Sequence, residues 1–426
     1  MNYNHNQNYL YFLSAQLFGY LAQWLFYFVV SWYVYELTHH AGLLGLIALS
    51  ALIPTLIFGQ LSGLLTDKLD SKKLLKCVQL GFLSHGLLSL ILVILGCFNI
   101  QIICMLVILQ GIILAFDKPV KQAILPSFKK IVSIEKIIAV NALCLNSARL
   151  LAPLLAGVLL KQYNISICFI LYFIFIASSA CFTLMLHVDK RSMLTQNQHN
   201  SSLLRLFKGQ NKYLSQNKTL IILLLLASVL SWTLGPVTML LPVLNHELYA
   251  GNSEMLGFLF AACALGNVLI GVFKLVVVEK QHDRMQWIFV SILGAVVSLV
   301  LFVLGANQRI ALFLLFLSAA FQLYALLSIN IEIQRRCDEA FRGRVLALFM
   351  LGFAGLTPLS NCLAGILVDI FSVKSVILAN CFICFMICFI LGFMVLLTRQ
   401  EETAYLMASP KNAARLNQAV SEIEQD

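Results

Sequence analysis

Residues 43–73 are LLGLIALSALIPTLIFGQLSGLLTDKLDSKK. No charged side chain occurs from Leu43 to Thr66, and five follow from Asp67 to Lys73. About 20 mostly apolar residues suffice to cross a bilayer as a helix. Peptide groups in lipid must bond within their own segment, and this run lacks the alternation of a barrel strand. The stretch therefore predicts a membrane-spanning helix that ends in a charged loop.

Eleven further runs share this apolar character. The twelve predicted spans cover residues 9–35, 43–65, 75–96, 100–124, 137–160, 165–187, 219–244, 254–278, 286–306, 309–333, 343–369 and 374–397. Composition agrees, because 60% of the 426 residues are apolar and 11% are charged, against about a quarter charged in soluble domains. We expect an all-α membrane protein with twelve transmembrane helices in two six-helix bundles.

The basic residues orient the chain. Of the 29 lysines and arginines, 25 fall in one alternate set of connections and in the tail, three in the other set, and Arg149 within a span. The positive-inside rule then places both termini in the cytoplasm, and we expect a bacterial inner-membrane location with no cleavable signal peptide. The net charge of +10 does not indicate nucleic-acid binding, because the basic residues lie in short loops between apolar runs.

The chain shows a weak internal repeat at an offset of 208 residues. The matches are Ala156-Gly157-Val158-Leu159 with Ala364-Gly365-Ile366-Leu367, Gly63 with Gly271, and Trp24 with Trp232. We expect six-helix bundles over 1–187 and 219–397, a cytoplasmic linker over 188–218 and a cytoplasmic tail over 398–426. Parallel repeats of this kind place the substrate near mid-membrane between the halves and give alternating access by rocking.

The loop Gly63-Leu64-Leu65-Thr66-Asp67-Lys68-Leu69-Asp70-Ser71-Lys72-Lys73 resembles the signature loop of the major facilitator superfamily, G-x-L-x-D-R/K-x-G-R-K. It departs at Asp70, where the pattern has Gly, and at Ser71, where it has a basic residue. The resemblance implies that Asp67 closes the cytoplasmic gate by contacting helix 11. Gly63 would allow close helix packing there.

A second stretch of sequence resembles one branch of this superfamily. The residues Ala115-Phe116-Asp117-Lys118-Pro119 and Ala148-Arg149-Leu150-Leu151-Ala152-Pro153 resemble the branch of macrolide efflux pumps and enterobactin-type siderophore exporters. Bacterial lysophospholipid transporters share much of this pattern. Pro153 and Gly157 resemble the helix 5 antiporter motif G-P-x-x-x-G, with Ala152 in place of its first Gly. These small residues would let helix 5 bend and approach helix 8 closely.

Arg149 is the most informative single residue. It lies well inside the predicted helix 5, and a guanidinium at that depth faces an interior or a water-filled cavity. It shares a helical stripe with Asn146, Pro153 and Gly157. Two roles fit: Arg149 binds an anionic or zwitterionic part of the substrate, or it pairs with a carbonyl or an acid and steadies the helix 5 bend.

Polar and aromatic residues on helices 1, 4, 7 and 10 are further candidates, because these helices usually line the cavity of such transporters. Such a lining, with few charges, suits a large amphipathic substrate. The substrate-binding candidates are Gln23, Trp24, Tyr27, Gln110, Trp232, Gln322, Tyr324 and Asn330, with Asn267 and Asn361 as similar residues on helices 8 and 11. Packing between helices is the alternative role for each.

Proton coupling has weaker support in the sequence. Helices 1 and 7 have no carboxylate at mid-depth, and Val107 stands where many drug:proton antiporters have Arg before Gln110-Gly111. Asp117 and Glu332 are the candidate proton carriers, and His85 is expected to pack in helix 3. We find no Walker loop, nucleophile–base arrangement or metal-ligand spacing, so we expect neither an enzyme nor a bound metal or cofactor.

We therefore expect a monomeric, proton-coupled secondary transporter in the lipid bilayer that exports an amphipathic small molecule, such as a drug or siderophore, from the cytoplasm across the inner membrane. A lysophospholipid translocase, an importer, and a membrane receptor that does not transport are the alternatives. Substrate identity, direction and coupling ion are not fixed by the residues alone.

Overall fold

The structure is a computed structural model that describes residues 5–128, 134–186, 213–215, 217–249, 251–276, 284–305 and 307–407. Within these residues twelve helices are long and apolar enough to cross a membrane, and none forms a strand. The first half contains α1 (His5–Thr38), α2 (Ala41–Lys68), α3 (Ser71–Ile94), α4 (Ile100–Ile124), the 3-10 turn η1 (Leu125–Phe128), α5 (Ile134–Gln162) and α6 (Ile165–Met185). The predicted all-α membrane fold is confirmed.

The second half has the same number of spans in more segments. They are α9 (Lys218–Leu234), α10 (Pro236–Tyr249), α11 (Ser253–Val276), α12 (Arg284–Val303), α13 (Gln308–Arg336), α14 (Glu339–Met350), the π-helical turn η3 (Leu351–Gly355), α15 (Leu356–Ile370) and α16 (Val373–Met407). The predicted spans 219–244 and 343–369 are thus interrupted helices. The last helix continues to Met407, into the segment expected as tail, and most of the expected linker lies outside the described residues.

The interruption of the seventh span has a local cause. Pro236 has no N–H to donate and its fixed φ suits the first position of a helix, so α10 begins there. Gly235 closes α9 by donating its N–H to the carbonyl of Ser231 at 3.1 Å. A Cβ at Gly235 would lie 2.2 Å from that carbonyl oxygen, so this position requires glycine.

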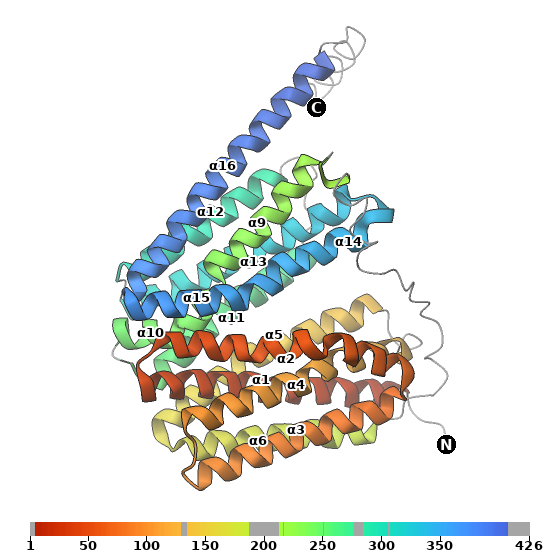
Figure 1. Ribbon diagram of the computed structural model, residues 1–426, viewed down its shortest axis with the longest axis vertical. Coiled ribbons are helices and arrows are strands. Elements are labelled where there is room, and N and C mark those ends of the chain that lie inside the picture. Colours follow the sequence, from red (N-terminus) through yellow and green to blue (C-terminus); the bar gives the residue numbers. More distant parts are fainter. Residues whose placement is uncertain are drawn as a thin grey trace.

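The same helix pairings occur in both halves. In the first half α1 packs on α6, α2 on α4, and α3 on α4 and α6; the equivalent pairs in the second half are α9 with α16, α11 with α13, and α12 with α13 and α16. The N-caps repeat too. Asn99 accepts from Ile102 N–H at 3.0 Å, and Asn307, 208 residues later, accepts from Ile310 N–H at 3.0 Å. Figure 1 shows the resulting two bundles, one red to yellow and one green to blue.

Asp70, the departure from the signature loop, caps a helix. Its side chain accepts a hydrogen bond from Lys72 N–H at 2.9 Å at the start of α3. Asp is among the best N-cap residues, whereas the family's Gly caps less strongly. The departure therefore keeps the turn between α2 and α3 and strengthens the beginning of α3.

The two halves contact one another through α5 with α11 and through α2 with α15. A Cβ at Gly157 would lie 2.6 Å from Ser253 O, and one at Gly365 would lie 2.6 Å from Ala41 O. Backbones this close tolerate only glycine. The close approach of helix 5 to helix 8 predicted from Gly157 is confirmed, and its internal repeat, Gly365, makes the equivalent contact.

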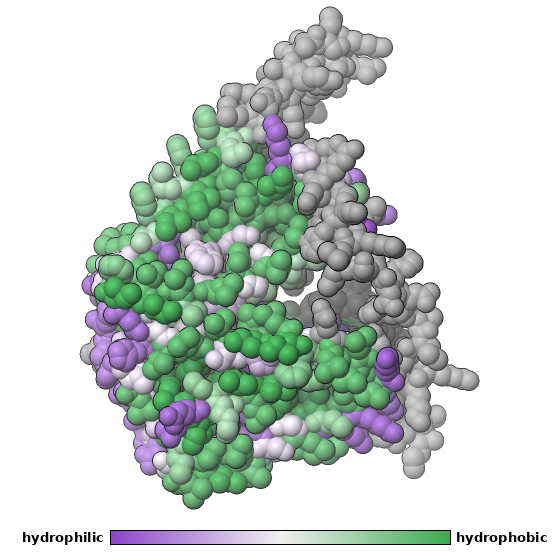
Figure 2. All heavy atoms as spheres, viewed as in Figure 1, coloured by the Kyte–Doolittle hydropathy of each residue, from purple (hydrophilic) through white to green (hydrophobic). Residues whose placement is uncertain are grey.

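We call the end of the molecule that carries residues 39–40 and 371–372 the closed end, and the opposite end, with residues 69–70 and 337–338, the open end. At the open end a Cβ at Gly63, Gly271 or Gly343 would meet none of the described residues within 4 Å. The ribbons of the two bundles diverge in that direction, and the surface view shows a hollow between the halves (Figures 1 and 2).

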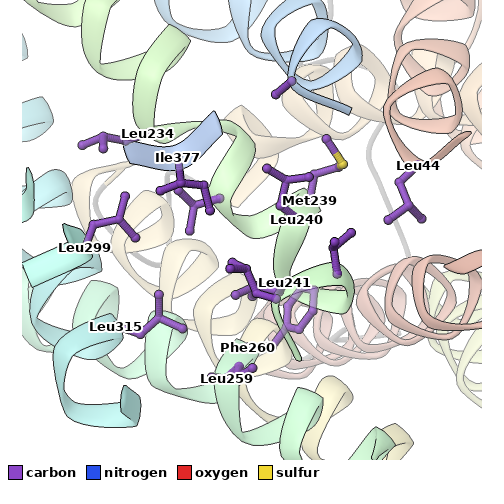
Figure 3. Close-up of a cluster of buried hydrophobic side chains, with 14 of the residues drawn as sticks. Leu44, Leu234, Met239, Leu240, Leu241, Leu259, Phe260, Leu299, Leu315 and Ile377 are labelled. Carbon is purple, nitrogen blue, oxygen red and sulfur yellow. The ribbon is translucent and has the colours of Figure 1, made fainter. Parts of the chain in front are cut away.

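The outer surface is apolar, as a lipid-facing surface must be. Leu56 is 68% exposed and Phe389 is 67% exposed, and Figure 2 shows that hydrophobic residues cover most of the visible face. The interior has one large cluster that runs through both halves. Leu44 of α2, Met239 of α10 and Phe260 of α11 belong to it and border the region between the bundles (Figure 3). This cluster supports the walls of the cavities described next.

Candidate functional site

A cavity of about 300 Å³, the central cavity, lies between the two bundles. Four predicted site residues line it: Trp24 and Tyr27 of α1, Arg149 of α5 and Gln322 of α13. Asn267 of α11 and Asn361 of α15, the two similar candidates, line it as well. Together with Ser231 of α9 and Met239 of α10, which belong to the seventh span, residues of six spans line one site at the interface of the halves.

Arg149 is the charged residue of this cavity. Its guanidinium lies over the ring of Trp24, 4.6 Å from the ring centroid. None of the described residues that line the cavity is acidic, and among the described residues the buried Nε of Arg149 has no hydrogen-bond partner. A cation–π contact offsets about 0.5–2 kcal/mol of the cost of burying a charge, which amounts to several kcal/mol. The site is therefore suited to an anionic group.

The walls combine aromatic surface with neutral hydrogen-bonding groups. Tyr27 meets Trp24 edge to face, with ring centroids 5.6 Å apart, and meets Phe260 of the other half at 6.2 Å. Opposite them, the hydroxyls of Ser231 and Thr357 are hydrogen-bonded at 2.7 Å. Asn361 Oδ1 is buried and has no partner in the described part of the chain. Such walls can hold the apolar body of a ligand and bond its polar groups.

A second cavity of about 170 Å³, the lateral cavity, shares Trp24, Tyr27 and Met239 with the central one. Gln23 of α1 and Gln110 of α4 also line it. The shared residues join the two cavities into one polar and aromatic surface. The structure thus brings the predicted residues of helices 1 and 4 together with Arg149.

A third, small cavity of about 30 Å³, the N-half cavity, lies within the first bundle. It shares Gln23 and Gln110 with the lateral cavity. Asp117 lines it and pairs with Lys121 Nζ at 2.7 Å, and both side chains are largely buried. Asp117 Oδ1 is buried without a hydrogen-bond partner among the described residues. The expected i,i+4 pair of helix 4 is confirmed.

Four of the predicted substrate-binding and proton-coupling residues lie outside these three cavities. Trp232 is half-buried on α9. The ring of Tyr324 lies 3.7 Å from Lys274 Nζ, and Asn330 accepts a hydrogen bond from Gln334 at 2.5 Å on its own helix. Glu332, 4% exposed, accepts from Arg336 Nε at 2.5 Å. The first three are placed as packing or helix-surface groups here, and Glu332 forms an ion pair in which its own carboxylate is buried and the arginine is exposed.

The predicted gating residues lie in different parts of the molecule. Pro153 and Gly157 lie where α5 crosses α11, and a Cβ at Gly257 would lie 2.8 Å from Pro153 O. A Cβ at Gly63, near the open end, would meet none of the described residues within 4 Å. Asp67 belongs to α2, but its side chain lies outside the described residues.

Sequence reasoning missed several lining residues, among them Gly235 of the α9–α10 break, Phe353 of η3 and Cys263 of α11. The Gly235-Pro236 pair was the available signal, because interrupted spans point to binding sites in transporters. The π-helical turn has no comparable sequence signature, although such turns are frequent at functional sites. Among the described residues no group of three or more His, Cys, Asp or Glu could hold a metal ion.

The family assignment follows from a comparison along nearly the whole chain. Residues 5–423 match the family model of the transmembrane secretion effectors, within the major facilitator group. The chain belongs to the transmembrane secretion effector family. A curated relative is the staphyloferrin A transporter of Staphylococcus aureus, which is 26% identical over 374 residues, 85% of this chain and 90% of the relative.

Solved transporters share the fold of this family member. The nucleoside transporter NupG superposes with a TM-score of 0.71 at 14% identity, over 93% of this chain and 99% of NupG. A POT family transporter in complex with 5-aminolevulinic acid superposes with a TM-score of 0.67 at 11% identity, over 90% and 95% of the two chains. At this identity the likeness concerns the fold. The chain is a multi-pass membrane transporter of the major facilitator type.

Proposed function

We propose that this transporter exports an amphipathic small molecule that carries an anionic group, a siderophore in particular, across the bacterial inner membrane. The observation that carries the proposal is Arg149, whose buried Nε has no hydrogen-bond partner among the described residues, in a cavity with no acidic residue among its described lining residues. An excess cation in a low-dielectric site favours an anion, and the aromatic walls favour an apolar body beside it. The staphyloferrin A relative supports a siderophore as the first substrate to test.

Transport would proceed by alternating access between the two bundles. With the basic loops in the cytoplasm, the open end faces the cytoplasm and the closed end faces outward. The substrate then enters between the bundles. Its anionic group binds at Arg149, and its apolar part packs against Trp24 and Tyr27. Separation of α5 from α11 and of α2 from α15 releases it on the other side.

Protons are the proposed coupling ion. Asp117 and Glu332 are each buried, each paired with a cation one helical turn away, and each has one oxygen without a partner in the described part of the chain. Protonation of either carboxyl would neutralise it and release its Lys121 or Arg336 partner. Buried carboxylates that pair with cations are the usual proton carriers of transporters.

Everted membrane vesicles provide the test, because an exporter accumulates its substrate in them. The wild-type protein should accumulate staphyloferrin A, or another anionic siderophore of a panel, and an uncoupler should abolish the accumulation. Arg149→Gln should weaken apparent affinity by about tenfold to a hundredfold, since hydrogen bonds to charged groups contribute about 1.5–3 kcal/mol. Arg309→Gln, an exposed arginine of α13, is the matched control. Accumulation of no anionic siderophore, or wild-type affinity in Arg149→Gln, would refute the proposal.

A further inference from the structure

A chain of hydrogen bonds runs from the core of the first bundle to the cavities. His85 of α3 is fully buried, and its Nε2 lies 3.1 Å from the carbonyl oxygen of Leu106. Its Nδ1 lies 2.8 Å from the hydroxyl of Tyr172 on α6. Gln110 Nε2 in turn lies 3.5 Å from that hydroxyl. Gln110 lines both the N-half and the lateral cavity, so the chain ends on the proposed substrate path.

The direction of this chain is fixed when His85 is neutral. A neutral imidazole has one N–H, and the Leu106 carbonyl can only accept, so the proton lies on Nε2. Nδ1 must then accept from the Tyr172 hydroxyl. The Tyr172 oxygen is left to accept from the amide NH₂ of Gln110. Gln110 therefore turns its carbonyl oxygen, an acceptor, toward the cavities.

A second proton on His85 reverses every bond beyond Leu106. Nδ1–H would donate to the Tyr172 oxygen, and both N–H groups of the imidazolium would still have acceptors. The Tyr172 hydroxyl would then donate to Gln110, which can accept only through Oε1. The amide would have to turn and present NH₂ to the cavities. The 3.5 Å bond between Gln110 and Tyr172 is at the weak end of the range, so the turn breaks little.

We propose that His85, Tyr172 and Gln110 form a proton-driven switch that changes Gln110 from a hydrogen-bond acceptor to a donor on the substrate path. The inference rests on the proposed export function and deepens it. Neutral His85 favours a substrate that has a hydroxyl or N–H group at Gln110 and an anionic group at Arg149. Protonation of His85 removes the acceptor, so proton and substrate exclude one another, as an antiporter requires.

The surroundings of His85 provide a proton route. Among the described residues, Tyr172 is the titratable side chain in contact with it; α1 contributes the ring of Phe26, 5.2 Å away, and α4 contributes the backbone carbonyl of Leu106. The Asp117–Lys121 pair and Tyr172 line the same N-half cavity, whose 30 Å³ can hold a water molecule. A proton delivered to the Tyr172 oxygen, as the hydroxyl proton moves to Nδ1, leaves Tyr172 neutral and His85 doubly protonated.

The direct test observes His85 in the wild-type protein without ligand. Protein with ¹⁵N-labelled histidine in lipid nanodiscs is measured by solid-state NMR from pH 3 to 8, and His85→Gln assigns the signal. We expect His85 to change from one to two protonated nitrogens in the acidic part of this range. In Tyr172→Phe, which keeps the ring, the change should shift to lower pH, since the imidazolium loses an acceptor. A singly protonated His85 at every pH overturns the switch, whether or not a substrate is known.

Measurements of staphyloferrin A binding test the switch independently of the proposed export function. Staphyloferrin A affinity should fall about fivefold on acidification, as expected for one lost hydrogen bond. Gln110→Ala should bind more weakly at high pH and lose this pH dependence, whereas Gln101→Ala, an exposed glutamine of the same helix, should keep it. If Arg149→Gln abolishes binding but Gln110→Ala keeps the wild-type pH profile, the export proposal stands and the switch is refuted.

Discussion

Lys161 and Asp369 lie 208 residues apart in the sequence, and each fastens one half of the molecule to the other at the closed end. Asp369 of α15 accepts hydrogen bonds from the N–H groups of Ala41 at 2.7 Å and Gly42 at 3.0 Å, the first residues of α2. Lys161 of α5 pairs with Glu254 in the first turn of α11. A carboxylate at a helix N-terminus is favoured by the helix dipole. The internal repeat has therefore placed two different polar contacts at equivalent positions.

Removing the Asp369 contact should weaken the closed end. In Asp369→Ala two N–H groups of α2 lose a charged acceptor, which is worth about 1.5–3 kcal/mol per bond. We expect the population that is open at this end to rise at least about tenfold. Spin labels at Tyr163 and Ser372, in a cysteine-free background, would report a longer distance. Asp70→Asn, which keeps the α3 cap at the open end, is the control; an unchanged distance distribution would contradict the prediction.

Alanine substitutions of glycines at the closed end and near the open end should shift the conformational equilibrium in opposite directions. Gly157→Ala places a Cβ 2.6 Å from the backbone oxygen of Ser253, so α5 and α11 must separate, at a cost of about 1–3 kcal/mol to the closed-end contact. In this conformation the Cβ of Gly63→Ala meets nothing within 4 Å in the part of the chain that the structure describes. If Gly63 packs only when the open end closes, its substitution should favour the present conformation. The distance between the spin labels at Tyr163 and Ser372 should increase in Gly157→Ala and not in Gly63→Ala.

The buried pair Asp117–Lys121 allows a test that separates folding from coupling. Asp117→Asn leaves Lys121 buried without its carboxylate, and breaking such pairs costs about 3–5 kcal/mol. The double variant Asp117→Asn/Lys121→Gln should recover most of the thermal stability while substrate movement no longer responds to an uncoupler. Melting curves in detergent and vesicle assays give the two readouts. A stable double variant that still responds to the uncoupler would exclude Asp117 as the proton carrier.

Much of this architecture could be predicted because each apolar run has only one way to satisfy its peptide groups in lipid. The inter-half contact of α5 was predictable from Gly157, and the cavity position of Arg149 from the cost of its charge. The break at Gly235-Pro236 was passed over because the apolar run continues through it. Trp232 was expected in the cavity because it lies on helix 7, one of the helices that usually line it, yet it is not among the lining residues. Sequence repeats fix which helices correspond, but the break in the second half changes which faces meet the cavity.

His85 shows a different limit. A lone histidine in an apolar helix predicts packing, and its burial agrees with that interpretation. Its partners Leu106 and Tyr172 come from two other helices, α4 and α6, and Gln110 of α4 bonds to Tyr172 in turn. No local sequence pattern indicates such a chain, because the direction of its hydrogen bonds depends on groups 21 and 87 positions away from His85. These groups come together only when α3, α4 and α6 pack against one another.

Trp24 provides the last prediction, because it contacts Arg149 directly and borders two cavities. Trp24→Ala removes the cation–π contact, worth about 0.5–2 kcal/mol, and part of the apolar wall. Affinity for an anionic substrate should fall about 10-fold to 100-fold, and Trp24→Phe should recover a part of it. Isothermal titration with staphyloferrin A gives the measurement, with Trp287→Ala, 56% exposed on α12, as the control. Because Trp24 holds the guanidinium from one side, loss of the ring should also reduce discrimination between anionic and neutral analogues. Equal losses for both analogues would mean that Trp24 contributes only apolar surface.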